Sequence, residues 1–304
     1  MSVTFCGRQL EHRVVNGSGT FDAIAAERAF GPALRAAFPF SAYVSKTITL
    51  RPRDGNAPPR LWETPAGMVN SIGLPNKGVE AYLAEDLPRY AMLPVPLITN
   101  VMGGTGEELA EVAAAVGHRP EIFALELNVS CPNVATGLDI GAVPSDLEAV
   151  VRRVRAVTAK PLIVKLTPNT ADVTLCAQAA EAAGADAVSL INTLRAVPLH
   201  PDGRGGRWLG SGQGGLSGPA IRVVALAQVA AVAERVALPI IGMGGVQHGR
   251  HAADLLSAGA TLVAVGTESF RDPRAAGRIT EELKALENAG RARTPPGGQA
   301  SVCP

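Results

Sequence analysis

A cysteine stands at an unusual place in the stretch LELNVSCPN, residues 125–133. Cys131 follows an apolar, strand-like run that ends near Asn128, and Pro132 and Asn133 come directly after it. Free cysteines usually behave as small hydrophobic residues and would more naturally lie inside such a run. A thiol on a turn, with an amide on each side, is therefore a candidate for chemistry rather than for packing.

Two lysines also end apolar runs, Lys46 in AYVSKTI (42–48) and Lys165 in PLIVKL (161–166). A lysine at a strand end can simply extend its amine into solvent. Because apolar residues flank Lys165, we favour a fixed cation beside a ligand. A flavin would suit this role, since a positive charge near its N1/O2 edge stabilises the anionic reduced ring.

Other strand-like runs likewise end in hydrogen-bonding side chains or in glycines. If the strands are parallel, these ends meet at one face of the fold, where barrel enzymes place their chemistry. A shared polar pocket is then a better interpretation than chance. The residues at these ends are Ser18, Lys46, Asn100, Asn128, Lys165, Asn192, the run 242–245, Gly266 and Thr267.

Three glycine clusters indicate a phosphate in this pocket. GMGG (242–245) and VGT (265–267) end two strand-like runs, and GGLSG (214–218) lies between two others. Backbone N–H groups of such loops often hold a phosphate near the last two strands of a barrel. Neither G-x-x-x-x-G-K-[ST] nor a strand–GxGxxG–helix unit is present, which argues against ATP or a Rossmann-bound NAD.

The elements that must position these residues alternate between strand and helix. Eight strand–helix units predict a parallel sheet closed into a (β/α)8 TIM barrel, with a doubly wound open sheet as the rival. We expect strands over 13–19, 42–48, 96–101, 123–129, 161–166, 187–192, 239–245 and 262–267. We expect helices over 106–117, 145–157, 171–184, 219–236, 249–259 and 273–290.

Two insertions interrupt this alternation. Residues 49–90 contain turns and one expected helix near 78–90, and residues 194–216 form an expected long loop. Loops of this length tend to be lids or binding loops, which we place at the C-terminal face of the barrel. We therefore expect one domain over 1–290 and a disordered tail over 291–304.

Composition limits the possible partners. The chain has 304 residues and a formal net charge of +1, so bulk charge favours neither nucleic acid nor an anionic membrane as a partner. No run approaches the length of a membrane helix and no signal peptide is evident, so a cytoplasmic location is the default. The four cysteines contain no C-x-x-C pair, so we expect neither a metal site nor an iron–sulfur cluster in this chain.

Several motifs together resemble the flavin-containing dihydroorotate dehydrogenases, over roughly residues 13–285. The stretch 55–78, which runs from GNAPPR to ETPAGMVNSIGLPNKG, looks most like the NAD-linked class 1B type. The first strand departs from the family's usual ASGTFG, because Asn16 and Asp22 are unexpected there. The motifs are SKTITLRPRDGNAPPRLWETPAGMVNSIGLPNKG, LELNVSCPN, VKLTP, INTLR, GGLSGPAI, GMGG and AVGT.

The resemblance implies FMN as the cofactor of this chain, lying across the barrel mouth. Its implied contacts are Ser18, Lys46, Thr47, Asn100, Asn128, Lys165 and Ile191. Its phosphate would lie on Gly218, Gly244, Gly245, Gly266 and Thr267.

The resemblance also implies the substrate, (S)-dihydroorotate, and a reaction that removes a proton from C5 and a hydride from C6. Cys131 matches the family's base, and a thiol suits this task because its pKa lies closer to neutrality than that of a hydroxyl. We expect Lys46 to be catalytic together with Cys131. The implied substrate contacts are Lys46, Asn70, Ser71, Ile72, Gly73, Leu74, Asn128, Asn133, Asn192 and Thr193.

For class 1B, the resemblance implies a partner subunit that carries FAD and a [2Fe–2S] cluster and passes electrons to NAD⁺. We expect a homodimer of this chain associated with that subunit as a heterotetramer. The membrane-bound class uses a serine base and an N-terminal extension, neither of which matches here. The alternatives are a fumarate-linked class 1A enzyme and a dihydropyrimidine dehydrogenase-like flavin enzyme.

Overall fold

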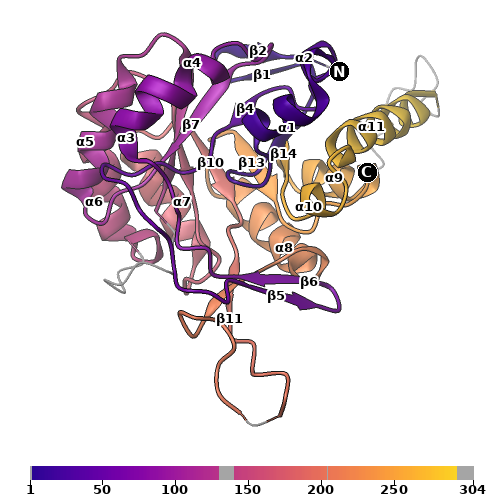
Figure 1. The fold of residues 1–304 in the computed structure, drawn as a ribbon. Helices are drawn as coiled ribbons and strands as arrows, with labels where there is room; N and C mark the ends of the chain where they lie inside the picture. Colours follow the sequence, from indigo (N-terminus) through magenta and orange to yellow (C-terminus); the bar gives the residue numbers. More distant parts are fainter. Residues whose placement is uncertain (1, 130–139, 204, 293–304) are drawn as a thin grey trace, which may run out of the picture.

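The computed structural model describes residues 2–129, 140–203 and 205–292 (Figure 1). The predicted base Cys131, its neighbour Asn133 and residues 293–304 of the predicted tail lie outside these ranges. None of the described helices combines the length and the apolar character that a bilayer crossing requires.

Eight parallel strands form one sheet, in the order β3-β14-β13-β10-β9-β8-β7-β4. Helices surround this sheet (Figure 1), so the predicted (β/α)8 barrel is confirmed. Each of the eight expected strands is present, although most are shorter than predicted. The strands are β3 (Val14–Asn16), β4 (Tyr43–Val44), β7 (Leu97–Val101), β8 (Ile122–Asn128), β9 (Leu162–Lys165), β10 (Ala187–Leu190), β13 (Ile240–Met243) and β14 (Leu262–Val265).

A side chain closes the barrel between its end strands β3 and β4. Asn16 is fully buried; its Nδ2 donates to the carbonyl oxygen of Val44 at 2.7 Å, and its Oδ1 accepts from the Val44 N–H at 2.8 Å. The amide thus makes the two hydrogen bonds that a neighbouring peptide group would make in a sheet. These two hydrogen bonds explain the presence of an asparagine at position 16, which is unexpected from the family pattern.

The strands are buried on both faces, as parallel strands in a barrel must be. Ile98, Ala124, Ile163 and Ile241 belong to the core inside the barrel, whereas the alternate residues of their strands pack against the helices. The helices are α1 (Ala23–Phe30), α2 (Pro32–Ala36), α5 (Gly106–Gly117), α6 (Pro144–Arg155), α7 (Val173–Ala182), α8 (Arg222–Ala233), α9 (Gly249–Ser257), α10 (Glu268–Arg271) and α11 (Ala275–Ala292), with short turns η2 (Ile140–Ala142) and η3 (Pro219–Ile221).

An N-terminal hairpin that the sequence did not predict packs against the core inside the barrel. It consists of β1 (Val3–Phe5) and β2 (Arg8–Leu10). Phe5 and Leu10 are buried in the same cluster as Ile98 and Ile163. The hairpin thereby covers the N-terminal end of the barrel and leaves the opposite end for the site.

The two insertions pair with each other, because both ends of the long loop expected over 194–216 form strands. They form an antiparallel sheet in the order β11-β12-β6-β5. The rings of Trp62 and Trp208, one from each insertion, lie edge to face with centroids 5.7 Å apart. The strands are β5 (Leu61–Thr64), β6 (Gly67–Asn70), β11 (Leu194–Ala196) and β12 (Gly214–Ser217), and the expected helix is present as α3 (Gly78–Ala81), η1 (Tyr82–Asp86) and α4 (Leu87–Tyr90).

His12 makes the stability of this fold dependent on pH. Burial, reinforced by Lys284, lowers the pKa of His12 to about 4, and its Nδ1 accepts a hydrogen bond from the Val14 N–H. The unfolded chain therefore binds a proton below about pH 6.5 that the folded protein does not bind until about pH 4. Within that window, falling pH should reduce the free energy of unfolding, by up to about 3 kcal/mol.

Urea titrations between pH 7.5 and 4 test this prediction on the wild type and on His12→Asn. An asparagine oxygen can accept the same hydrogen bond without taking up a proton. The variant should therefore show a flatter pH dependence. Identical slopes for the two proteins would contradict the assignment to His12.

Candidate functional site

A cavity of about 540 Å³ opens at the C-terminal ends of the barrel strands. This volume lies within the usual range for a small-molecule or cofactor site. Residues that end or follow β3, β4, β8, β9, β10, β13 and β14 contribute to its wall. The predicted residues that line it are Ser18, Lys46, Thr47, Asn70, Ile72, Gly73, Leu74, Asn128, Lys165, Ile191, Asn192, Thr193, Gly218, Gly244, Gly245, Gly266 and Thr267.

Two lysines bring positive charge to this cavity. Lys165 ends β9 and is only 7% exposed, and no described carboxylate lies within ion-pair distance of its amine. Lys46 follows β4 and is more exposed, yet desolvation lowers the pKa of its amine, against an opposing effect of Asp22. Both amines therefore gain from an anionic or electron-rich ligand.

The glycine loops after β12, β13 and β14 form another part of the wall. Gly218, Gly244 and Gly245 have φ angles of +93°, +132° and +67°, a region that favours glycine. A Cβ on Gly244 would also lie 2.7 Å from the Cβ of Ala225. At Gly266, in contrast, the nearest protein atom to an added Cβ is Thr20 Cγ2 at 3.8 Å, so its backbone is open to a close approach.

Asn100, which was predicted to contact the cofactor, lies beneath the cavity rather than on its wall. It faces the barrel interior, two residues beyond the interior residue Ile98, and is fully buried. Its Nδ2 donates to Glu126 at 2.5 Å, and Glu126 also accepts from Ser189 at 2.7 Å. Within the described chain, Asn100 Oδ1 is buried without a hydrogen-bond partner.

Ser71, predicted as a substrate contact, is also absent from the wall and only 1% exposed. Its hydroxyl accepts from Asn56 Nδ2 at 2.8 Å and forms a short hydrogen bond with Ser211. Ser71 therefore fixes the two insertions to each other. The other two predicted residues, Cys131 and Asn133, lie outside the described residues.

Several polar residues at or beneath the site were not predicted from the sequence. Gln247 and Glu268 line the cavity, and Glu126 lies in the layer below it. A charged residue inside the apolar run LELN was a usable signal for Glu126, because buried carboxyl groups are rare without partners. Gln247 and Glu268 carried no such signal, since they follow glycine motifs in ordinary polar loops.

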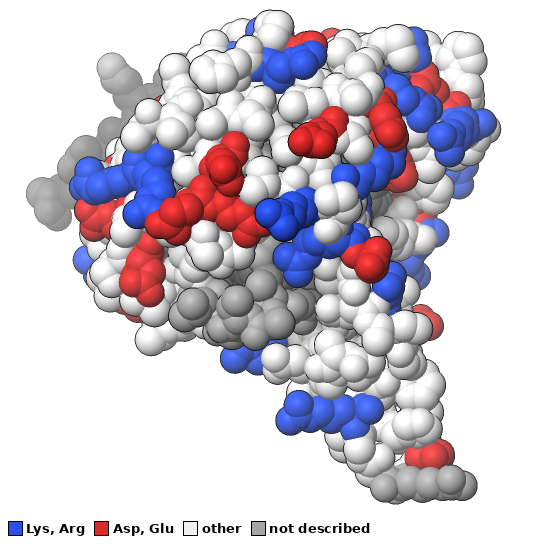
Figure 2. All heavy atoms as spheres, turned by 60° about the vertical axis from the view of Figure 1, so that its left-hand side comes forward, with Lys and Arg blue, Asp and Glu red and all other residues white. Residues whose placement is uncertain are grey.

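The outer surface carries charged side chains of both signs. On the face shown in Figure 2, basic and acidic side chains are interspersed over the helices, in keeping with the net charge of +1. Among the described residues, no group of three or more His, Cys, Asp or Glu side chains is placed to hold a metal ion.

A (β/α)8 barrel with two lysines and three glycine loops at its C-terminal mouth is the architecture of a cofactor-dependent barrel enzyme. The family model described as dihydroorotate dehydrogenase matches residues 1–286. The chain therefore belongs to the dihydroorotate dehydrogenase family, whose members are oxidoreductases.

Curated relatives agree with this family. The catalytic subunits of dihydroorotate dehydrogenase B (NAD(+)) from Citrifermentans bemidjiense and Desulforudis audaxviator are each 45% identical to this chain, over 93% of it and over 92% and 91% of their own lengths. A protein of Solibacter usitatus, provisionally named dihydroorotate dehydrogenase A (fumarate), is 42% identical over 95% of this chain and 94% of its own length.

Proposed function

We propose that this chain oxidises (S)-dihydroorotate to orotate in pyrimidine biosynthesis, with FMN as its cofactor. The observation that carries the proposal is the cavity itself, where Lys46, Lys165 and the glycine loops meet at one mouth. Membership of the dihydroorotate dehydrogenase family supports the substrate.

Three features of the residues present fit FMN. The loops of Gly244, Gly245 and Gly266 offer backbone N–H groups without side chains, which suits a phosphate. Lys165 supplies a cation on the cavity wall, which suits the electron-rich edge of the ring. Asn100 Oδ1, buried without a partner in the described chain, further indicates a polar environment at this depth of the barrel.

The substrate-binding residues would lie along the insertions and the ends of β8 and β10. Asn70, Asn128 and Asn192 all line the cavity. Amide side chains can donate to and accept from the alternating N–H and C=O groups of the substrate ring without adding charge. Lys46 would hold the substrate carboxylate and orient the ring, together with Ile72, Gly73, Leu74 and Thr193.

In the reaction, Cys131 would take the proton from C5 on the face of the ring that is turned away from the cofactor. FMN, when bound, supplies the acceptor for the hydride that leaves C6. Asn128 ends the strand from which the Cys131 segment departs, and its register partner in β9 is Lys165. The base and the cation are thus attached to neighbouring strands of one sheet.

We further propose the NAD-linked route for the electrons, because several relatives are named catalytic subunits of an NAD(+) enzyme. The chain would form a homodimer and dock a separate subunit that holds FAD and a [2Fe–2S] cluster. The fumarate-linked route is the second candidate, and the Solibacter usitatus relative supports it.

Anaerobic mixing of the purified protein with dihydroorotate tests the proposal directly. The protein should be yellow, release FMN on denaturation and lose its visible absorbance when substrate is added. NAD⁺ should reoxidise it only with the partner subunit, whereas direct reoxidation by fumarate would favour the second candidate. A protein that cannot bind FMN, or a bound flavin that dihydroorotate fails to bleach, would contradict the proposal.

A further inference from the structure

The end of the cavity formed by the loops after β13 and β14 contains a charge that opposes phosphate binding. Glu268 lines the cavity beside Thr267, and it is the sole carboxylate among the described lining residues. The lining cations belong to other strands, since Lys46 follows β4 and Lys165 ends β9. A phosphate on the Gly245 and Gly266 loops would therefore lie on the same wall as an acidic side chain.

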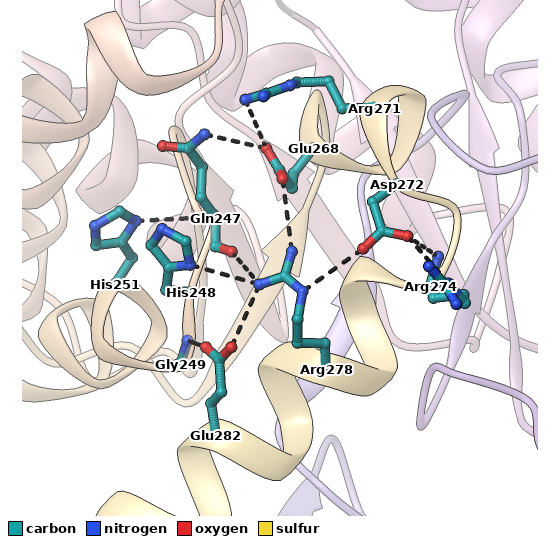
Figure 3. A network of polar contacts seen from close by, with 10 residues as sticks. All are labelled: Gln247, His248, Gly249, His251, Glu268, Arg271, Asp272, Arg274, Arg278 and Glu282. Carbon is teal, nitrogen blue, oxygen red and sulfur yellow. Dashed lines mark hydrogen bonds and ion pairs between the residues drawn. The ribbon is translucent and has the colours of Figure 1, made fainter.

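Hydrogen bonds and ion pairs connect this carboxylate to neighbouring side chains (Figure 3). The side chain of Glu268 is 10% exposed, and its Oε2 accepts from Gln247 Nε2 at 3.1 Å. Its Oε1 lies 3.6 Å from Nη2 of Arg278, and Arg271 approaches its Oε2 at 3.7 Å. Positive charge from behind the loop thus offsets the charge of Glu268.

Arg278 also contacts the other glycine loop. Its Nη1 donates to the backbone oxygen of Gln247 at 2.9 Å, two residues after Gly245. One guanidinium on α11 therefore touches both loops, the one after β13 through Gln247 and the one after β14 through Glu268.

Two further carboxylates hold this guanidinium in place. Nε of Arg278 lies 3.6 Å from Oδ2 of Asp272, and its Nη1 lies 3.4 Å from Oε1 of Glu282. The other carboxylate oxygen of Glu282 accepts a hydrogen bond from the Gly249 N–H at 2.6 Å. The planar fork of arginine permits several such contacts at once, whereas a lysine ammonium acts as a compact point charge.

We propose that Arg278 is a positioning residue for the phosphate of the cofactor. It fixes the two glycine loops relative to each other and offsets the charge of Glu268, and it does so without lining the cavity. This inference rests on the proposed function, because it needs a phosphate-bearing cofactor at these loops.

The test compares FMN with riboflavin, which has the same ring and side chain but no phosphate. Binding of each to the apoprotein is measured by quenching of flavin fluorescence. Arg278→Gln should weaken FMN binding about tenfold or more and leave riboflavin binding nearly unchanged, since the network acts on the phosphate end only. Arg278→Lys should also lose part of the preference for FMN, because an ammonium cannot contact both loops.

Arg274→Gln is the matched control. Arg274 precedes α11, is 91% exposed and contacts Asp272, so the variant loses the same charge without touching either glycine loop. It should bind FMN as the wild type does. Adding Glu268→Gln to Arg278→Gln should restore part of the FMN affinity, because the uncompensated carboxylate is removed.

The outcomes separate this inference from the proposed function. If the wild type binds neither flavin, the proposed function fails. If the wild type prefers FMN and both Arg278 variants keep that preference, the inference alone is overturned. Equal losses for FMN and riboflavin would also overturn it, since they would indicate general damage to the fold. Circular dichroism of each variant shows whether the barrel is intact.

Discussion

Replacing Cys131 with alanine should leave FMN bound and slow its reduction by dihydroorotate about 10²–10⁴-fold, the usual contribution of a positioned general base. Cofactor binding should persist because the lysines and glycines proposed to hold FMN lie on other loops. Stopped-flow absorbance under anaerobic conditions measures the rate of bleaching. Bleaching at the wild-type rate would remove Cys131 from the mechanism.

Two further variants sharpen this test. Cys131→Ser should recover some activity with a pH optimum displaced upward, because a hydroxyl has a much higher pKa than a thiol. Cys6→Ala is the matched thiol control. Cys6 lies on the hairpin at the opposite end of the barrel, and burial raises the pKa of its thiol to about 12, so its loss should not change the rate.

Replacing Asn16 with leucine should reduce the free energy of unfolding by about 2–5 kcal/mol. Leucine has a similar size, but it would leave the buried N–H and C=O groups of Val44 without their present partners. Urea denaturation followed by circular dichroism measures the change.

The exposed Asn288 on α11 offers a control, and its replacement by leucine should change the free energy of unfolding little. The Asn16 variant should also bind FMN less tightly, because Ser18 and Gly17 follow directly and the Ser18 hydroxyl donates to Ser45 across the same seam at 2.8 Å. A leucine variant as stable as the wild type would show that Asn16 does not close the barrel.

The strands and most helices of the barrel were predictable because their patterns are local. A parallel strand buried on both faces must be apolar along its length, and the helices carry apolar residues at helical spacing. The hairpin at 3–10 escaped prediction because VTF and RQL are too short to give a periodic signal. The sheet of the two insertions escaped because its strands are more than a hundred residues apart, at 61–70 and 194–217.

The residues of the site also divide into those that the sequence predicted correctly and those that it did not. Strand ends identified the lysines and the glycine loops of the wall, since parallel strands bring those ends to one face whatever lies between them. Asn100 differs because a strand end fixes the face of a residue but not its depth, whereas Ser71 was expected only from the family resemblance. Asn100 lies one layer below the cavity beside Glu126, and Ser71 is turned toward Ser211 of the other insertion.

The sequence by itself determined the barrel, its open mouth and the family, because apolar periodicity and contiguous motifs are properties of neighbouring residues. Only the tertiary structure decided how Asn16 closes the sheet and how Arg278 joins two glycine loops. Those contacts connect residues 28 and 31 positions apart, Asn16 with Val44 and Gln247 with Arg278. Such pairs meet only after the strands and helices between them have packed, so no local pattern can reveal them.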